Sequence, residues 1–307
     1  MNHDVKLNRY GFYTLIDVPS ERELQDYYAH KYYQENHSVY KKSYSDEEHL
    51  YIKNKIKQKY SIIQSKFPVS SNNSFLDIGC GEGFALKFFD ELNWKVTGLD
   101  YSKVGVENHN SAYKQFVTDG DIFKNISALK KSGAVFDLIW IDNVLEHVLA
   151  PLELLNDCNQ LISDSGILVI EVPNDFSIVQ AKVKSMNLIE NDYWIAIPDH
   201  ISYFNKAGLV NICSAAGLTN IELLADFPID FNLFHPNANY IKDKTTGKGA
   251  HLQRIRIENL LHEISVRKTN SLYKAMADMG LGRQIIGFFK KNDDDIRMFK
   301  KEHIQIR

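Results

Sequence analysis

One acidic residue and three glycines at alternating positions carry the clearest chemical signal in the sequence: Asp77, Gly79, Gly81 and Gly83. An apolar run precedes the glycines and a helical pattern follows them, which predicts a tight turn at a helix N-terminus, where free backbone amides face a ligand. The dinucleotide fingerprint, G-x-G-x-x-G, places its third glycine one residue later. Because a carboxylate beside the turn repels a pyrophosphate and attracts an α-amino group, the pattern favours a cationic ligand that carries an amino acid.

A second acid, Asp100, stands at the end of the next expected strand, residues 95–100. An acid at the tip of this strand is placed to grip a ribose diol. The two segments together resemble motifs I and II of the class I S-adenosylmethionine-dependent methyltransferases. Three later segments resemble the motifs that follow in that family, in the same order: residues 116–122, 136–148 and 161–173. Leu145 to Pro151, L-E-H-V-x-x-P, is similar to a signature of the small-molecule branch, which includes ubiquinone-biosynthesis-type and sugar methyltransferases.

The resemblance implies S-adenosylmethionine as the cofactor, with S-adenosylhomocysteine as the product. It places the methionine part on Asp77 and the glycine turn, the ribose on Asp100, the adenine amino group on Asp121, and the sulfonium above Asn143. Tyr101 or Ile122 would cover the adenine faces. The expected cofactor residues are therefore Asp77, Gly79, Cys80, Gly81, Gly83, Asp100, Tyr101, Asp121, Ile122, Asn143 and, from the N-terminal segment, Tyr33. The alternative for Tyr33 and its neighbouring tyrosines is packing of helices onto the core.

Two histidines suit the proton transfer that a hydroxyl acceptor requires. Methyl transfer is an in-line displacement that depends on positioning, but a hydroxyl also needs a base with a pKa near neutral. His147 follows the fourth expected strand, where the cleft opens, and Glu146 is placed to orient it. His200 lies in a segment similar to one found after the fifth strand in the same branch. Either histidine could be the base, and the alternatives are structural: a helix cap or packing residue for His147, and a helix entry anchored by Asp199 for His200. No metal is expected.

The acceptor is expected to contact residues 228–282 and a lid formed by residues 174–200. The candidate contacts in the first segment are His235, Asn237, Asn239, Tyr240, His251 and Arg254. These side chains offer hydrogen bonds and cations of the kind that a sugar or nucleotide-linked sugar needs, although a solvated polar loop has the same composition. The resemblance to methyltransferases of surface-polysaccharide pathways favours a carbohydrate acceptor.

Composition narrows the class of partner. The 307 residues have a formal net charge of −3, 44% hydrophobic and 24% charged residues, as in ordinary soluble proteins, and no basic bias for nucleic acid. Three cysteines without a C-x-x-C pair imply neither a disulfide framework nor a zinc site. No apolar stretch is long enough for a membrane span. We therefore expect a cytoplasmic monomer or homodimer that acts on a small molecule.

These residues must be positioned by a Rossmann-like α/β fold. Strands and helices alternate between residues 74 and 227, with strands expected at 74–79, 95–100, 115–118, 136–141, 166–172 and 219–226. A last strand, antiparallel in the resembling family, is expected near residues 282–291. The expected divisions are a helical leader or lid at 1–66, a cofactor-binding core at 67–227, a helical insertion on the substrate side at 228–282, and a last strand and tail at 283–307.

Three functions compete on this evidence. The first is transfer of a methyl group to a sugar hydroxyl with a histidine base, and the second is C- or N-methylation of a quinone-like or amino-sugar acceptor. The third, an NAD-dependent oxidoreductase, conflicts with the glycine spacing and with Asp77.

Overall fold

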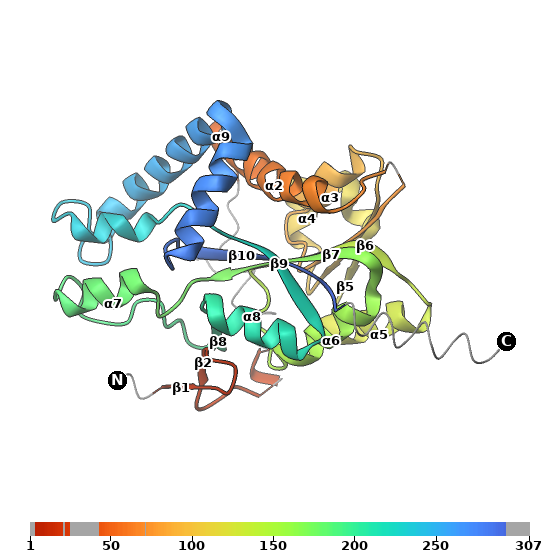
Figure 1. Ribbon diagram of the computed structural model, residues 1–307, viewed down its shortest axis with the longest axis horizontal. Helices are drawn as coiled ribbons and strands as arrows, with labels where there is room; N and C mark the ends of the chain where they lie inside the picture. Colours follow the sequence, from red (N-terminus) through yellow and green to blue (C-terminus); the bar gives the residue numbers. More distant parts are fainter. Residues whose placement is uncertain (1–3, 21, 25–42, 71, 293–307) are drawn as a thin grey trace.

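A central sheet with helices on both faces forms the body of the protein. The computed structural model describes residues 4–292 except 21, 25–42 and 71. In this described part the central sheet has seven strands (Figure 1), in the spatial order β5 (Val117–Asp119), β4 (Lys95–Asp100), β3 (Ser74–Ile78), β6 (Phe136–Asp142), β7 (Ile162–Pro173), β10 (Gln284–Lys291) and β9 (Leu218–Ala225). The strands from β5 to β7 run parallel, and β10 lies antiparallel between β7 and β9. The predicted Rossmann-like fold is confirmed.

The inner strands are apolar because helices cover both of their faces. In β6, for example, Leu138, Ile139, Trp140 and Ile141 are all buried. One boundary was predicted wrongly: β7 begins at Ile162 and not near residue 166. Its extra residues include exposed polar positions, so hydrophobic periodicity gave no sign of them.

The register of the parallel strands brings four acids to one edge of the sheet. Ile78, which follows Asp77, pairs with Leu99, which precedes Asp100. On the next two strands Asp142 pairs with Glu171. Since parallel strands end at the same edge, these carboxylates gather at the carboxyl edge, where open α/β sheets bind ligands.

Helices cover the two faces of the sheet, as the upper and lower layers of Figure 1 show. One face packs against α2 (Asp46–Lys66), α3 (Phe84–Asp90), α4 (Val104–His109) and α9 (Gly247–Asp278), and the other against α5 (Ile122–Lys131), α6 (Pro151–Leu161) and α8 (Lys206–Ala215). A 3-10 helix, η2 (Ser111–Phe116), leads into β5. Helix α2 begins at a capping box, in which Ser45 and Glu48 satisfy each other's backbone amides, so its start is fixed locally.

The N-terminal segment departs from the expected helical leader. Strands β1 (Val5–Leu7) and β2 (Tyr13–Leu15) form a hairpin that joins β8 (Ser202–Tyr203) in a second sheet. The hairpin is held by Phe12, which is buried and lies 4.3 Å from Phe204 between ring centroids. Further on, Ser20 and Glu23 exchange the hydrogen bonds of a helix N-terminal cap.

The expected insertion and lid both fold as helical segments. Between β9 and β10 lie η3 (Ile229–Phe234), η4 (Lys244–Thr246) and α9, which is kinked at Ser265. After β7, helix α7 (Ile178–Ser185) packs with the insertion around a small core that includes Val183, Trp194 and Leu233. None of the helices in the described part of the chain combines the length and apolar composition needed to cross a bilayer.

Candidate functional site

A cavity of about 620 Å³ lies at the carboxyl edge of the sheet, between the glycine turn and helices α2 and α9. Its walls include the glycine turn, the ends of β4, β6 and β7, the loop after β6, and helices α2 and α9. The predicted residues that line it are Asp77, Gly79, Cys80, Gly81, Gly83, Asp100, Tyr101, Ile122, Asn143, His147 and His251. The residues that sequence analysis missed include Tyr44, Tyr51, Lys55, Lys59, Asp142 and Glu171.

The backbone conformation of the glycine turn requires glycine at three positions. Gly79, Gly81 and Gly83 all have positive φ angles, of 76°, 49° and 75°. A Cβ on Gly79 would lie 2.2 Å from Cγ2 of Val144, in the loop after β6. The Gly81 amide donates to the Asp100 carboxylate at 2.8 Å. The second acid of the motif therefore supports the turn as well as lining the cavity.

Replacing Gly79 by alanine should damage the turn by more than its φ angle alone explains. The matched control is Gly133→Ala, because Gly133 has a similar φ of 72° but open space around its Cβ. We expect Gly79→Ala to lower the free energy of unfolding by about 1–3 kcal/mol more than the control, since Val144 must move. Chemical denaturation of both variants measures the difference, and equal losses would contradict the packing argument.

Asp77 lies beneath the turn as a buried carboxylate. Burial and the neighbouring charges of Asp142 and Asp100 raise its pKa well above the usual range, against the opposing charge of Lys59. An α-amino group or a sulfonium beside Asp77 would offset this repulsion. The buried acid and the glycine cradle thus fit the cationic amino-acid end of S-adenosylmethionine.

Lys59 of α2 joins the two strand-end acids on the floor of the cavity. Its ammonium lies 2.5 Å from both Asp142 Oδ2 and Glu171 Oε2, and 4.6 Å from the centroid of the Trp140 ring. Although burial opposes the shift, the charge of Lys59 holds the pKa of Asp142 below its usual value. The sequence offered one sign of this role of Lys59, which is its position on the apolar face of a helix, four residues after Lys55.

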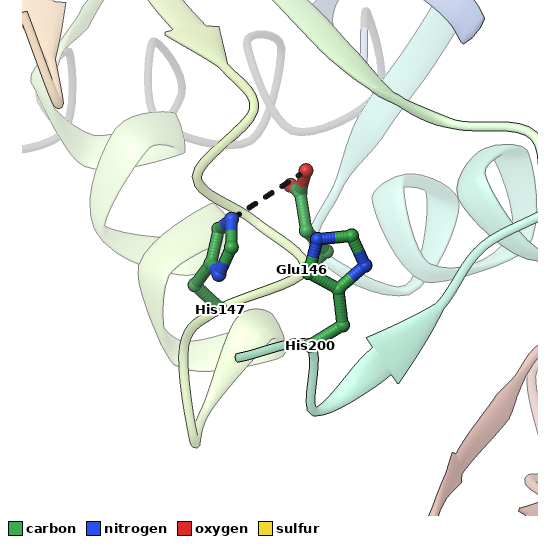
Figure 2. A group of neighbouring side chains, drawn as sticks. All are labelled: Glu146, His147 and His200. Atoms are coloured by element: carbon green, nitrogen blue, oxygen red, sulfur yellow. Dashed lines mark ion pairs between the residues drawn. The ribbon is translucent and has the colours of Figure 1, made fainter. Parts of the chain in front are cut away.

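A cluster of three side chains forms where the loop after β6 meets the segment before β8. Figure 2 shows these side chains, Glu146, His147 and His200, close together. The Glu146 carbonyl accepts from the amides of Ile201 and Ser202, at 2.9 and 3.0 Å, so the loop after β6 is tied to the segment that carries His200. Nε2 of His147 lies 3.8 Å from Glu146 Oε1, and the two imidazole rings lie 4.8 Å apart in an edge-to-face arrangement. Of the three, His147 lines the cavity.

Asp199 fixes the orientation of the His147 ring. Nδ1 of His147 lies 2.7 Å from the Asp199 carbonyl oxygen. A carbonyl can only accept, so Nδ1 carries a hydrogen and Nε2 is the nitrogen directed to Glu146. Both predicted histidines are thus brought together, and Asp199 serves His147 as well as lying next to His200.

The three groups of this cluster have divergent pKa values. Burial raises the pKa of Glu146 to about 7. Burial opposes protonation of His147, but the hydrogen bond to Asp199 and the charges of Glu146 and Asp199 outweigh it and raise its pKa to about 9. Burial and the adjacent His147 charge lower the pKa of His200 to about 4. A proton in this cluster therefore resides preferentially on His147.

Two predicted cofactor residues, Asp121 and Tyr33, are not among the residues that line the described cavity. Asp121 caps α5, where its Oδ1 accepts from the Lys124 amide at 2.9 Å, and it does not line the cavity. Because this cap uses one carboxylate oxygen and leaves the other, the contact of Asp121 with the adenine amino group stays a prediction. Tyr33 lies outside the described residues. Tyr44, a later tyrosine of the same segment, does line the cavity, and its hydroxyl donates to Glu82 at 2.8 Å.

The six residues predicted to bind the acceptor divide into two groups. His251 lines the cavity. Arg254 is not among the lining residues, but its Nη2 lies 3.1 Å from Nδ1 of His251. Four lie away from the cavity wall: Asn239, Tyr240, His235 and Asn237. Asn239 donates to the carbonyls of Leu188 and Leu233, which connects the insertion to the lid segment, and Tyr240 donates to Asp230 within the insertion. His235 and Asn237 are exposed. For these four the predicted acceptor contact is not supported, because folding already uses the polar groups of the first two and the others face solvent.

Comparison with known proteins gives a consistent result. Residues 52–223 match the family described as "Methyltransferase domain". A probable S-adenosylmethionine-dependent methyltransferase of Mycolicibacterium smegmatis is 23% identical over 153 residues, which cover 50% of this chain and 54% of that protein. A ubiquinone biosynthesis O-methyltransferase of Coxiella burnetii (strain RSA 331 / Henzerling II) is 29% identical over 57% of this chain and 74% of its own length. The match thus spans about half the length of the mycobacterial relative.

Similarity also extends to solved structures. A SAM-dependent methyltransferase from Archaeoglobus fulgidus aligns with a TM-score of 0.46 and 18% identity, over 78% of this chain and 94% of that one. The plantazolicin methyltransferase BpumL, solved in complex with SAH, aligns with a TM-score of 0.46 and 15% identity, over 80% and 85% of the two chains.

Proposed function

The chain belongs to the methyltransferase-domain family of S-adenosylmethionine-dependent enzymes, and we propose that it methylates a hydroxyl of a small polar metabolite, a sugar or a nucleotide-linked sugar. The cofactor supplies a methyl group on a sulfonium, and the neutral thioether that departs when the carbon–sulfur bond breaks is a good leaving group. What remains for this chain is to hold the acceptor in line and to remove its proton.

The cofactor end of the proposed site comprises the glycine turn, Asp77 and Asp100. The glycines leave the backbone open to a ligand, and Asp77 offers its negative charge to the amino-acid end. Asp100, at the end of β4, is placed for the ribose hydroxyls, and Tyr101 or Ile122 for the adenine faces. Asn143, held by a hydrogen bond of 2.7 Å to Asp142, completes the end nearest the sulfonium.

The proposal of a hydroxyl acceptor rests on the cluster of Glu146, His147 and His200. An unprotonated amine needs little help from a base, whereas a hydroxyl does. His147 lines the cavity and has a carboxylate near Nε2 and a carbonyl on Nδ1, the arrangement of an oriented imidazole. In a site without metal, His147 is the proposed base, and Glu146 and Asp199 position it. Because these neighbours raise its pKa to about 9, the neutral form that accepts a proton becomes more populated as the pH rises toward that value.

The helices that line the cavity support a polar acceptor. Lys55, Glu48 and Tyr51 of α2 and His251 of α9 line the cavity and offer several hydrogen-bond partners. A second candidate function is C- or N-methylation, at carbon of a quinone-like acceptor or at nitrogen of an amino sugar. The relatives named ubiquinone biosynthesis O-methyltransferases favour oxygen as the methylated atom, and so support a hydroxyl acceptor over this second candidate.

The proposal is tested by incubating the purified protein with S-adenosylmethionine and separate pools of nucleotide sugars, free sugars and quinone precursors. Mass spectrometry would follow the mass gain of one methylene, and tandem spectra would locate it. Methylation of a sugar hydroxyl supports the proposal. A product methylated only at carbon or nitrogen would move the assignment to the second candidate.

Asp100→Ala should weaken cofactor binding by about tenfold or more, since it removes charge-assisted hydrogen bonds to the ribose. It also removes the acceptor of the Gly81 amide. The control is Asp119→Ala, because Asp119 ends the neighbouring strand but is exposed and pairs with Lys103. Calorimetry with S-adenosylhomocysteine measures both variants. Unchanged affinity in Asp100→Ala would remove Asp100 from the cofactor site.

A further inference from the structure

Glu146, His147 and His200 also have the composition and spacing of a metal site. Each offers one ligand atom, and these atoms all lie within 4.8 Å of one another. Figure 2 shows that they come from two segments, the loop after β6 and the segment that leads into β8, so the group is assembled by tertiary structure. Two imidazoles and one carboxylate, with further positions open, are a recurrent ligand set for catalytic Zn²⁺ and non-haem Fe²⁺.

Two polar atoms of the cluster, one on Glu146 and one on His200, have no hydrogen-bond partner among the described residues. Glu146 is 1% exposed, and its Oε2 has no hydrogen-bond partner among the described residues. Nδ1 of His200 is likewise buried, and no partner for it occurs in the described part of the chain. A buried carboxylate oxygen without a partner is costly, and a bound cation would satisfy it.

A supporting group is already in place around the cluster. Metal-bound histidines usually donate their second ring nitrogen to a carbonyl or carboxylate, which fixes the ring and directs the ligating nitrogen. His147 makes this contact, with Nδ1 2.7 Å from the Asp199 carbonyl and Nε2 on the side of Glu146. The Asp199 carboxylate also lies 3.9 Å from Nε2 of His200, so the surroundings are suited to a positive ion.

We propose that Glu146, His147 and His200 bind one divalent transition ion, of the Zn²⁺ type, at the acceptor end of the cavity. Bonds of about 2.1 Å place two ligands on one ion roughly 3.0–3.5 Å apart, so binding would draw the three side chains together by about 1 Å. Two imidazoles favour Zn²⁺, Co²⁺ or Fe²⁺ over Mg²⁺, which prefers oxygen ligands.

The ion would change how an acceptor hydroxyl becomes reactive. With Nε2 of His147 committed to the metal, the imidazole no longer acts as a free base. An oxygen that occupies an open position of the ion becomes more acidic, as a zinc-bound water does. Because His147 lines the cavity, that position would face acceptors with a hydroxyl to offer.

The test is direct metal binding, in the absence of cofactor and acceptor. The chelator-treated full chain is titrated with Co²⁺, followed by visible absorption, and bound Co²⁺ is then displaced with Zn²⁺. We expect one ion per chain, and affinity at least tenfold weaker in His200→Ala and Glu146→Gln. His235→Ala is the matched control, since His235 is exposed and outside the cluster, and its affinity should equal that of the wild type.

Three outcomes would overturn the proposal: no binding of Co²⁺ or Zn²⁺ by the wild type, equal affinity in all variants, or binding of Mg²⁺ alone. Calorimetry with S-adenosylhomocysteine checks that each variant is folded. Should the buried Glu146→Gln fail this check, His200→Ala and the wild-type titration still decide. Because no acceptor is present, failure of the metal site leaves the proposed methyl transfer standing, and failure to find methyl transfer leaves the metal result intact.

Discussion

Lys59→Met is expected to lower the free energy of unfolding by about 3–5 kcal/mol, because it leaves the buried carboxylate of Glu171 and the partly buried carboxylate of Asp142 without their shared cation. Lys59 is 2% exposed, and its ammonium contacts Asp142 and Glu171 at 2.5 Å each. Methionine keeps most of the length and apolar volume of the lysine stem. The loss therefore comes mainly from charge, and equilibrium denaturation in urea measures it.

The control for this prediction is Lys274→Met in α9. Lys274 also pairs with a carboxylate, Glu222, at 2.7 Å, but its side chain is 55% exposed. Exposed pairs contribute roughly 0–1 kcal/mol, so this variant should be nearly neutral. Similar losses in the two variants would mean that the buried position of Lys59 has no special role.

The pKa of Asp142 determines how Lys59→Met should change the dependence of the free energy of unfolding on acid pH. Lys59 lowers the pKa of Asp142 in the folded protein, so its ionised form contributes stability near neutral pH that is lost as the pH falls through the folded pKa. In Lys59→Met this contribution disappears. The variant should therefore lose less stability than the wild type between neutral and acid pH.

The sheet and the glycine turn could be predicted because their signals are local. Apolar runs mark β3, β4 and β6, and Gly79 and Gly83 show at once where the chain needs positive φ angles. Asp77 and Asp100 stand next to these features, so the cofactor end of the cavity followed from neighbouring residues. The hairpin β1–β2 was missed because its partner, β8, lies far along the chain. Two strands of three residues have too short a pattern to be distinguished from a helix.

The acceptor end of the cavity depends on contacts between distant residues. Lys59 and Asp142 are 83 positions apart, and His147 meets Asp199 across 52 positions. Composition suggested that polar residues such as Asn239 contact a substrate. It could not show that the carbonyls of Leu188 and Leu233 already use this amide. Residue type indicates which chemistry is available, whereas tertiary packing decides which groups remain free for a ligand.

His147→Ala should lower kcat by about 10²- to 10⁴-fold, the contribution of a positioned acid or base. The same loss is expected whether His147 accepts the proton itself or binds an ion that acidifies the hydroxyl. Affinity for S-adenosylhomocysteine should stay close to that of the wild type, because the glycine turn and Asp100 hold the cofactor. Initial rates with the acceptor identified by mass spectrometry measure the effect.

A second substitution separates chemistry from packing at this position. His147→Asn retains an amide nitrogen at the position of Nδ1 that can donate to the Asp199 carbonyl, so it preserves the contact that joins the two loops. It supplies no base and only a weak metal ligand, and we expect it to be as inactive as His147→Ala. The control His235→Ala, exposed and away from the cavity wall, should keep the wild-type rate. If His147→Asn turns over at the wild-type rate, the cluster does not deprotonate the acceptor. An amine, which needs no base, then becomes the better assignment.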